Sequence, residues 1–200
     1  MAHINSIGAG LFSDLSVAMP AAPLSTAALT ALDTASEFQA LFATSIESVG
    51  GTKAVNTFVR LGNVRTFPAM GTPANIVKVP TYGQKTSSSI QGQADAPQLE
   101  VDLNFVASDW AKDLVPTLLG GAVGDGKQYV FRFTLMNSEP TGTGDTRYAA
   151  TAAGVGTVQN SQYYWIGKME ALLVTPSLTD ANTAKLSMSI QSSFFGAYTV

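Results

Sequence analysis

Two carboxylates, Glu100 and Asp102, stand one residue apart in a segment, Gln98 to Phe105, that alternates polar and apolar side chains. In a strand they point to the same face, because successive side chains alternate between faces. Such a pair could act as general acid and base, or hold a hard cation through its oxygens. The simpler alternative, which we favour, is that the pair solvates the polar face of a sheet.

Other residues with chemical potential have structural explanations. Gly120, Gly121, Gly124 and Gly126 flank Asp125, but no Gly-Lys-Ser/Thr follows, so we interpret the glycines as a helix end and a turn. Trp110 and Trp165 could stack a ligand, yet amphipathic positions of this kind favour the core.

The chain has no cysteine and a single histidine, His3. Disulfides, thiolate chemistry and histidine-based metal sites are therefore excluded. We predict a protein that is not an enzyme, with no cofactor and no metal.

The low charge content is the most informative feature of the composition. Charged residues make up 12% of the 200 residues and hydrophobic residues 46%, whereas soluble domains average about 25% charged residues. Either subunit contacts cover much of the surface, or a Ser/Thr-rich β protein has a neutral polar exterior. We favour assembly, since obligate interfaces are more apolar than ordinary surface. The net charge of −3 disfavours a protein that grips nucleic acid through phosphates.

Membrane insertion and secretion have little support in the sequence. No segment approaches the roughly 20 apolar residues that span a bilayer. The run Leu15 to Ala22 resembles a signal peptide only faintly, because Asp14 stands before it and the first cation of the chain is Lys53. We expect neither a signal peptide nor a membrane association.

The first quarter of the chain is expected to form an N-terminal arm with a helical segment, residues 1–51, ahead of a β domain, residues 52–200. Residues 1 to about 25 lack a sustained period and predict an extended or weakly ordered arm. From Ser25 to Ser48 apolar residues recur at helical spacing, and Ser36 is a candidate N-cap. The apolar stripe packs either on its own domain or on a neighbouring subunit; it comprises Leu29, Leu32, Phe38, Leu41, Phe42 and Ile46.

The β domain is expected to contain strands separated by turns and one helix. Residues 55–67 predict a strand broken at Gly62-Asn63, and residues 74–82 another before a polar segment at 85–93. We expect residues 85–93 to form a hairpin with residues 98–105. A helix is predicted from Ser108, with Trp110, Leu114 and Leu118 on one stripe.

The last third of the chain predicts three further strands. Residues 129–135 return to period two after the Gly124–Gly126 turn, and residues 137–162 predict an exposed loop available for contacts. Residues 163–174 and 185–195 predict a closing hairpin. Its first strand is expected to place four side chains on one face, namely Trp165, Met169, Ala171 and Leu173.

In this order, the elements resemble the major tail tube proteins of long-tailed bacteriophages. The resemblance covers roughly residues 55–198. It rests on the strand Lys85 to Gln93, the Asp-Ala-Pro link, the alternating strand Gln98 to Phe105 and the single helix from Ser108. It continues through the strand Tyr129 to Leu135 and the closing pair Tyr164 to Glu170 and Lys185 to Phe194. The N-terminal helical region departs from compact members of that family.

The resemblance implies a mainly β, sandwich or barrel-like tail tube fold with one packed helix and a partly helical N-terminal extension. It implies hexameric rings stacked into the hollow tail tube of a virion, assembled in the host cytoplasm. The implied partners are further copies of the chain and the tape measure, tail terminator and tail tip proteins. Double-stranded DNA would pass through the lumen without specific binding.

Two sets of residues follow as candidates from the resemblance. A lumen through which DNA slides should be polar and anionic, because cations would hold the phosphates; the lumen-facing candidates are Glu100, Asp102, Ser87, Ser89 and Gln91. Residues 67–83, residues 137–162 and the N-terminal arm are candidate ring-stacking segments, with the candidate contacts Phe67, Met70, Pro73, Tyr82, Arg147 and Tyr148.

Competing interpretations remain open at this stage. A β-sandwich capsid-decorating protein or adhesin would share the strand pattern but stay discrete in solution. A secretion-system tube subunit is a structural relative of the tail tube and is poorly separated from it by sequence. An enzyme would rest on Glu100 and Asp102 alone.

Overall fold

The computed structural model describes residues 13–19, 24–42, 44–45, 57–61, 64–69, 76–92, 98–105, 123–136 and 161–196. Two short helices, α1 (Thr26–Thr30) and α2 (Ala35–Ala40), accompany two β-sheets. The main sheet has the strand order β2-β3-β1-β8-β9-β10-β7-β4, and a separate two-stranded sheet pairs β5 with β6. All described pairings are antiparallel except β2 with β3. The chain is therefore mainly β, as predicted.

The strands of the main sheet range from short edges to one long central strand. They are β1 (Asp14–Met19), β2 (Thr44–Ser45), β3 (Thr57–Arg60), β4 (Val64–Thr66), β7 (Gln98–Asn104), β8 (Tyr129–Leu135), β9 (Ser161–Thr175) and β10 (Thr183–Ile190). The small sheet consists of β5 (Ile76–Val79) and β6 (Ser88–Gln91).

The main sheet is curled into a half-barrel, and the connection between β3 and β4 shows why. β4 is the last strand at one end of the sheet, whereas β3 is second from the other end. Only residues 61–63 separate them along the chain, so the path from Arg60 to Val64 spans at most about 14 Å. The two ends of the sheet must therefore curve toward each other.

The inside of the curl is filled by the larger hydrophobic core. Leu15 of β1, Leu103 of β7 and Trp165 of β9 are at most 1% exposed and belong to one cluster, although their strands come from both halves of the sheet. The Trp165 ring stacks on Phe131 of β8 with centroids 5.5 Å apart. The prediction that Trp165 belongs to the core is confirmed.

A second core lies on the opposite face of the same sheet, beneath the helices. Phe38 of α2 is fully buried and stacks on Tyr164 of β9, with ring centroids 5.6 Å apart. Leu29 of α1 and Phe58 of β3 join the same cluster. The described residues of the apolar stripe thus pack on their own domain, which is one of the two alternatives that the sequence left open; Ile46 lies outside the described residues.

The N-terminal part of the chain differs from the expected arm. Asp14–Met19 form β1, which pairs with both β3 and β8 inside the sheet. The helical segment consists of two short helices, and α2 begins after Thr34 rather than Ser36, with Glu37 accepting hydrogen bonds from the backbone N–H groups of Asp33 and Thr34. Asp14 to Val17 alternate polar and apolar side chains only briefly, and pairing with β3 and β8, formed later in the chain, makes residues 14–19 a strand.

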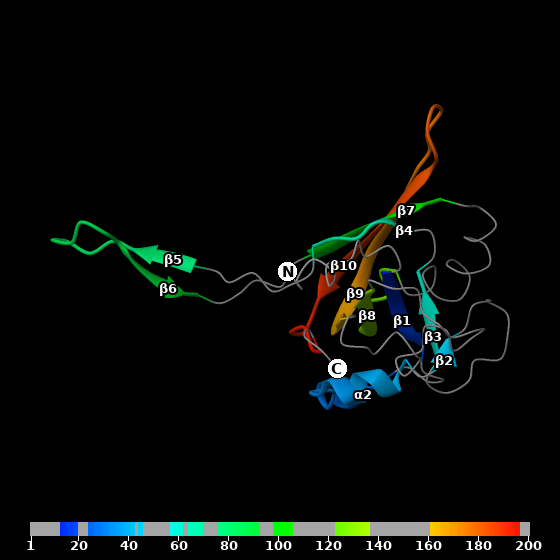
Figure 1. Ribbon diagram of the computed structural model, residues 1–200, viewed down its shortest axis with the longest axis horizontal. Helices are drawn as coiled ribbons and strands as arrows, with labels where there is room; N and C mark the ends of the chain where they lie inside the picture. Colours follow the sequence, from blue (N-terminus) through cyan, green and yellow to red (C-terminus); the bar gives the residue numbers. More distant parts are fainter. Residues whose placement is uncertain are drawn as a thin grey trace, which may run out of the picture.

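The predicted hairpin between residues 85–93 and 98–105 is wrong. β6 pairs with β5, with Ile90 opposite Val77, whereas β7 pairs with β10 and β4. Chain proximity suggested the wrong partner. β7 has an apolar face that packs in the main core, whereas all four residues of β6 are exposed. In Figure 1 the β5–β6 hairpin extends away from the main sheet.

A β-bulge corrects the predicted face of β9. Ser187 lies opposite Ala171 while the next residue, Met188, lies opposite Met169, so β9 holds one extra residue at Glu170. An inserted residue reverses the alternation of side chains beyond it. Met169 is therefore buried with Trp165 as predicted, but Leu172 replaces Ala171 and Leu173 on the core side, and Leu173 is 60% exposed.

Several other predictions are confirmed. The segment at 55–67 is split into β3 and β4 around Gly62-Asn63, the Gly124–Gly126 turn precedes β8, and β9 and β10 form the closing hairpin. β9 begins at Ser161, two residues before the predicted start. The predicted helix from Ser108 and most of the predicted loop at 137–162 lie outside the described residues.

Candidate assembly surfaces

The acidic pair Glu100 and Asp102 lies on the outer face of β7. The alternate residues Leu99, Val101 and Leu103 lie on the opposite face, toward the core. The Glu100 carboxylate accepts a hydrogen bond from the Lys185 ammonium of β10 at 3.0 Å. That contact raises the pKa of Lys185. The pair is thus part of a solvated face with a cation beside it.

The same outer face continues across β10 onto β9. Ser189 donates a hydrogen bond of 2.6 Å to Glu170, and Lys168 lies opposite Ser189 in the ladder. Carboxylates outnumber ammonium groups on this face by three to two: Glu100, Asp102 and Glu170 against Lys168 and Lys185. We call these five residues and Ser189 the outer polar face; it is mildly anionic.

The remaining lumen candidates lie elsewhere. Ser89 and Gln91 are on β6, and Ser87 directly precedes it; all three are exposed. They belong to the projecting hairpin and not to the sheet that carries Glu100. The structure therefore divides the five lumen candidates between two sheets.

The β5–β6 hairpin exposes apolar side chains on both faces, with more of them on one face. Val77 and Val79 on β5 share one face with Ile90 on β6, according to the register, and they are 43%, 38% and 56% exposed. The opposite face carries the pairs Lys78–Ser89 and Ile76–Gln91, and Ile76 is 64% exposed. An isolated two-stranded hairpin is marginally stable in water, so a partner on the more apolar face would stabilise it.

The tip of the hairpin presents an aromatic side chain. The N–H of Gln84 donates to the carbonyl of Thr81 at 3.3 Å, closing a tight turn. Gly83 has φ +84°, a conformation that favours glycine at the third position of such a turn. Tyr82 precedes it and is fully exposed.

The structure places the ring-stacking candidates in different environments. Phe67 is half-buried, and its ring packs on Phe133 in the main core with centroids 5.1 Å apart. Tyr82 is the exposed tip just described. The other four candidates, Met70, Pro73, Arg147 and Tyr148, lie outside the described residues.

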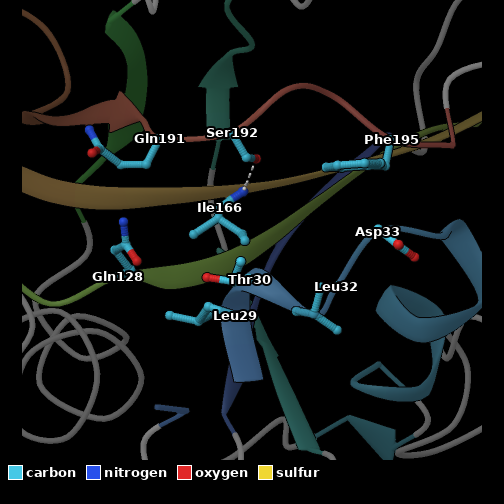
Figure 2. A pocket seen from close by; sticks show the side chains of 9 residues that line it. All are labelled: Leu29, Thr30, Leu32, Asp33, Gln128, Ile166, Gln191, Ser192 and Phe195. Carbon is cyan, nitrogen blue, oxygen red and sulfur yellow. Dashed lines mark hydrogen bonds between the residues drawn. The ribbon is translucent and has the colours of Figure 1, made fainter. Parts of the chain in front are cut away.

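A pocket of about 330 Å³ opens between the helical segment and the sheet (Figure 2). It is lined by α1, the link to α2, β9 and the segments that flank β8 and β10. Its apolar lining residues are Leu29, Leu32, Ile166 and Phe195, and its polar lining residues are Thr30, Asp33, Gln128, Gln191 and Ser192. Ser192 is held in place because its hydroxyl accepts a hydrogen bond of 2.9 Å from the Ile166 N–H. No sequence signal indicated this pocket, because its residues come from distant segments.

A buried charge cluster beneath the helices was also missed by the sequence analysis. Asp14 accepts hydrogen bonds from Arg60 at 2.6 Å, from Arg132 at 3.3 Å and from the Ser16 hydroxyl. The Arg132 guanidinium lies over the rings of Phe42 and Phe58, with its central carbon 5.0 and 4.6 Å from their centroids. Burial lowers the pKa of Arg132 and Asp14 opposes that shift. The Arg60 side chain is 33% exposed, but Asp14 and Arg132 are almost completely buried, so the cluster belongs to the packed interior and is not an open site.

Within the described residues, no group of three or more histidine, aspartate or glutamate side chains is placed to hold a metal ion. None of the described helices is long and apolar enough to cross a membrane. No protein-family model matches the chain, and no curated protein matches it. The fold and its surfaces define a mainly β protein with a curled, largely antiparallel sheet and a projecting hairpin that exposes apolar side chains.

Proposed function

We propose that this chain is a structural subunit that assembles with itself into stacked hexameric rings, forming the hollow tail tube of a long-tailed bacteriophage. The observation that carries the proposal is the β5–β6 hairpin, which extends away from the main sheet (Figure 1). Its residues Val77, Val79 and Ile90 and the tip residue Tyr82 are exposed. Apolar surface of this kind is typical of association sites. The low charge content of the chain agrees with a surface covered by copies of itself.

The outer polar face supports the second part of the proposal, that DNA passes through the assembly. Its mild excess of carboxylates disfavours tight binding of phosphates, which requires clustered cations. We propose that Glu100 and Asp102 face the lumen, and that the virion partners are the tape measure, tail terminator and tail tip proteins. In this proposal the chain catalyses no reaction.

Negative-stain electron microscopy of the purified chain over a range of concentrations, with sizing of the same samples, tests the proposal. Hollow tubes or stacked rings with a central hole are the expected result. Discrete monomers or trimers at every concentration would overturn it and favour a capsid-decorating protein or adhesin.

A further inference from the structure

We propose that the hairpin tip of one copy docks in the pocket of a second copy, with Tyr82 entering the space between α1 and the sheet. This inference rests on the proposed self-assembly and names the two surfaces that meet. It starts from two features that lack a counterpart within the described residues: an exposed aromatic tip and a partly apolar pocket.

The sizes and chemistry of the two surfaces match. The pocket, at about 330 Å³, lies at the lower end of the range for small ligands, so it suits one aromatic side chain rather than a large molecule. Leu29, Leu32 and Phe195 offer an apolar surface for the ring, while Asp33 and Gln191 offer acceptors for the phenol hydroxyl. Tyrosine, with an apolar body and a polar tip, is a preferred anchor at such sites.

Charge complementarity points to a second copy as the occupant. The hairpin segment, residues 76–92, carries Lys78 and Lys85 and no carboxylate. The helical segment, residues 24–42, carries Asp33 and Glu37 and no lysine or arginine. The nearby cation Lys127 lies 3.7 Å from Asp125, which offsets its charge. Opposite charges of this kind steer association and fix its register.

The absence of cysteine from the chain allows a direct test. Thr30→Cys places a thiol in the pocket wall, and Gln84→Cys places one at the hairpin tip while keeping the Tyr82 anchor. Both replaced side chains are exposed, so both variants should fold. The two variants are mixed in equal amounts and oxidised, and covalent dimers are measured by non-reducing gel. The matched control replaces Gln84→Cys by Leu178→Cys, whose side chain is also exposed, at the turn between β9 and β10.

We expect a covalent dimer in the Thr30→Cys plus Gln84→Cys mixture at several times its yield in the Thr30→Cys plus Leu178→Cys mixture or in either variant alone. Equal yields in all mixtures would overturn the docking inference. If the unmodified chain still formed tubes, the proposed function would stand and only this contact would be wrong. A specific crosslink between copies that form only discrete small oligomers would support the contact and overturn the tube.

A second measurement does not depend on crosslinking. Tyr82→Ser should raise the protein concentration needed for half-maximal assembly by more than about tenfold, as expected for loss of an aromatic anchor. Leu178→Ser is the control and should leave that concentration unchanged. Equal behaviour of the two variants would contradict the role of Tyr82.

Discussion

Asp14 and Arg132 form an ion pair of 3.3 Å with both side chains almost completely buried, 2% and 0% exposed. They come from neighbouring strands, β1 and β8, and lie under the helices. A charge buried in this way is tolerated only while its partner remains. The pair therefore ties the N-terminal strand to the centre of the sheet.

Asp14→Asn should destabilise the fold by about 3–5 kcal/mol, because Arg132 would stay buried without its counter-charge. The measurement is urea unfolding followed by circular dichroism. Replacing both partners, as in Asp14→Leu with Arg132→Met, should cost less than the sum of the single changes. An unchanged unfolding midpoint for Asp14→Asn would show that the pair contributes little.

Leu103→Asp should abolish folding, because residue 103 is 1% exposed in the centre of the main core and an unpaired carboxylate cannot be solvated there. The matched control is Leu173→Asp, since Leu173 is 60% exposed beyond the bulge of β9. Soluble expression and circular dichroism should separate the two variants. A folded Leu103→Asp protein would contradict the assignment of β7 to the core.

Two tyrosines predict loss of stability at high pH. Burial raises the pKa of Tyr164 to about 12, and burial together with a hydrogen bond to Asp125 raises the pKa of Tyr129 to about 12. An unfolded tyrosine ionises near pH 10. The contribution of these two tyrosines to the free energy of unfolding is therefore fully present below about pH 10. It is lost as the pH rises toward 12, because the unfolded chain loses these protons first.

Urea unfolding at a series of pH values checks this dependence. The free energy of unfolding of the Tyr129→Phe variant should fall less steeply between pH 10 and 12 than that of the unmodified chain, since one of the two titrating tyrosines is removed. Identical slopes for the two proteins would contradict a perturbed Tyr129.

Glu100→Lys should leave assembly intact but make tubes retain DNA, because the introduced ammonium group would join those of Lys185 and Lys168 on the outer polar face. Cosedimentation with short duplex DNA should rise at low salt and fall as salt increases. Asp180→Lys is the control, an equal charge change at a side chain 68% exposed in the β9–β10 turn. Equal DNA retention by both variants would remove the lumen assignment of Glu100.

The sequence predicted those parts of the fold that depend on local alternation. β7, β8, β9 and β10 have strong period-two patterns, and their positions and the closing hairpin are confirmed. β1 was missed because its alternation is short: only Asp14-Leu15-Ser16-Val17 alternate polar and apolar, and the apolar run Val17 to Met19 ends the period. The polar side chains of Asp14 and Ser16 are nonetheless buried, with Arg60 and Arg132 as partners in place of water. Partners on distant strands cannot be read from the local sequence.

The sequence could place some candidate site residues together but not others, for the same reason. Glu100 and Asp102 could be placed on one face because they share a strand. Whether Ser89 and Gln91 lie on the same sheet as this pair depends on which strands pair. Strand pairing is strongly specified by sequence only where one face of the strand must be buried. The pocket combines α1, β9 and the chain after β10, so only the folded arrangement brings its residues together.

The position of β1 between β3 and β8 also bears on how the chain folds as it is made. Asp14 pairs with residues on both sides, and its partner Arg132 lies 118 residues further along the chain. During synthesis β1 and β3 can pair early, but the edge that β8 will occupy stays open until the chain has been made as far as Tyr129. Contacts of such long sequence separation fold slowly. The nascent chain therefore carries an open strand edge while the residues between β3 and β8 are made, and an open edge of this kind is a template for pairing with another strand.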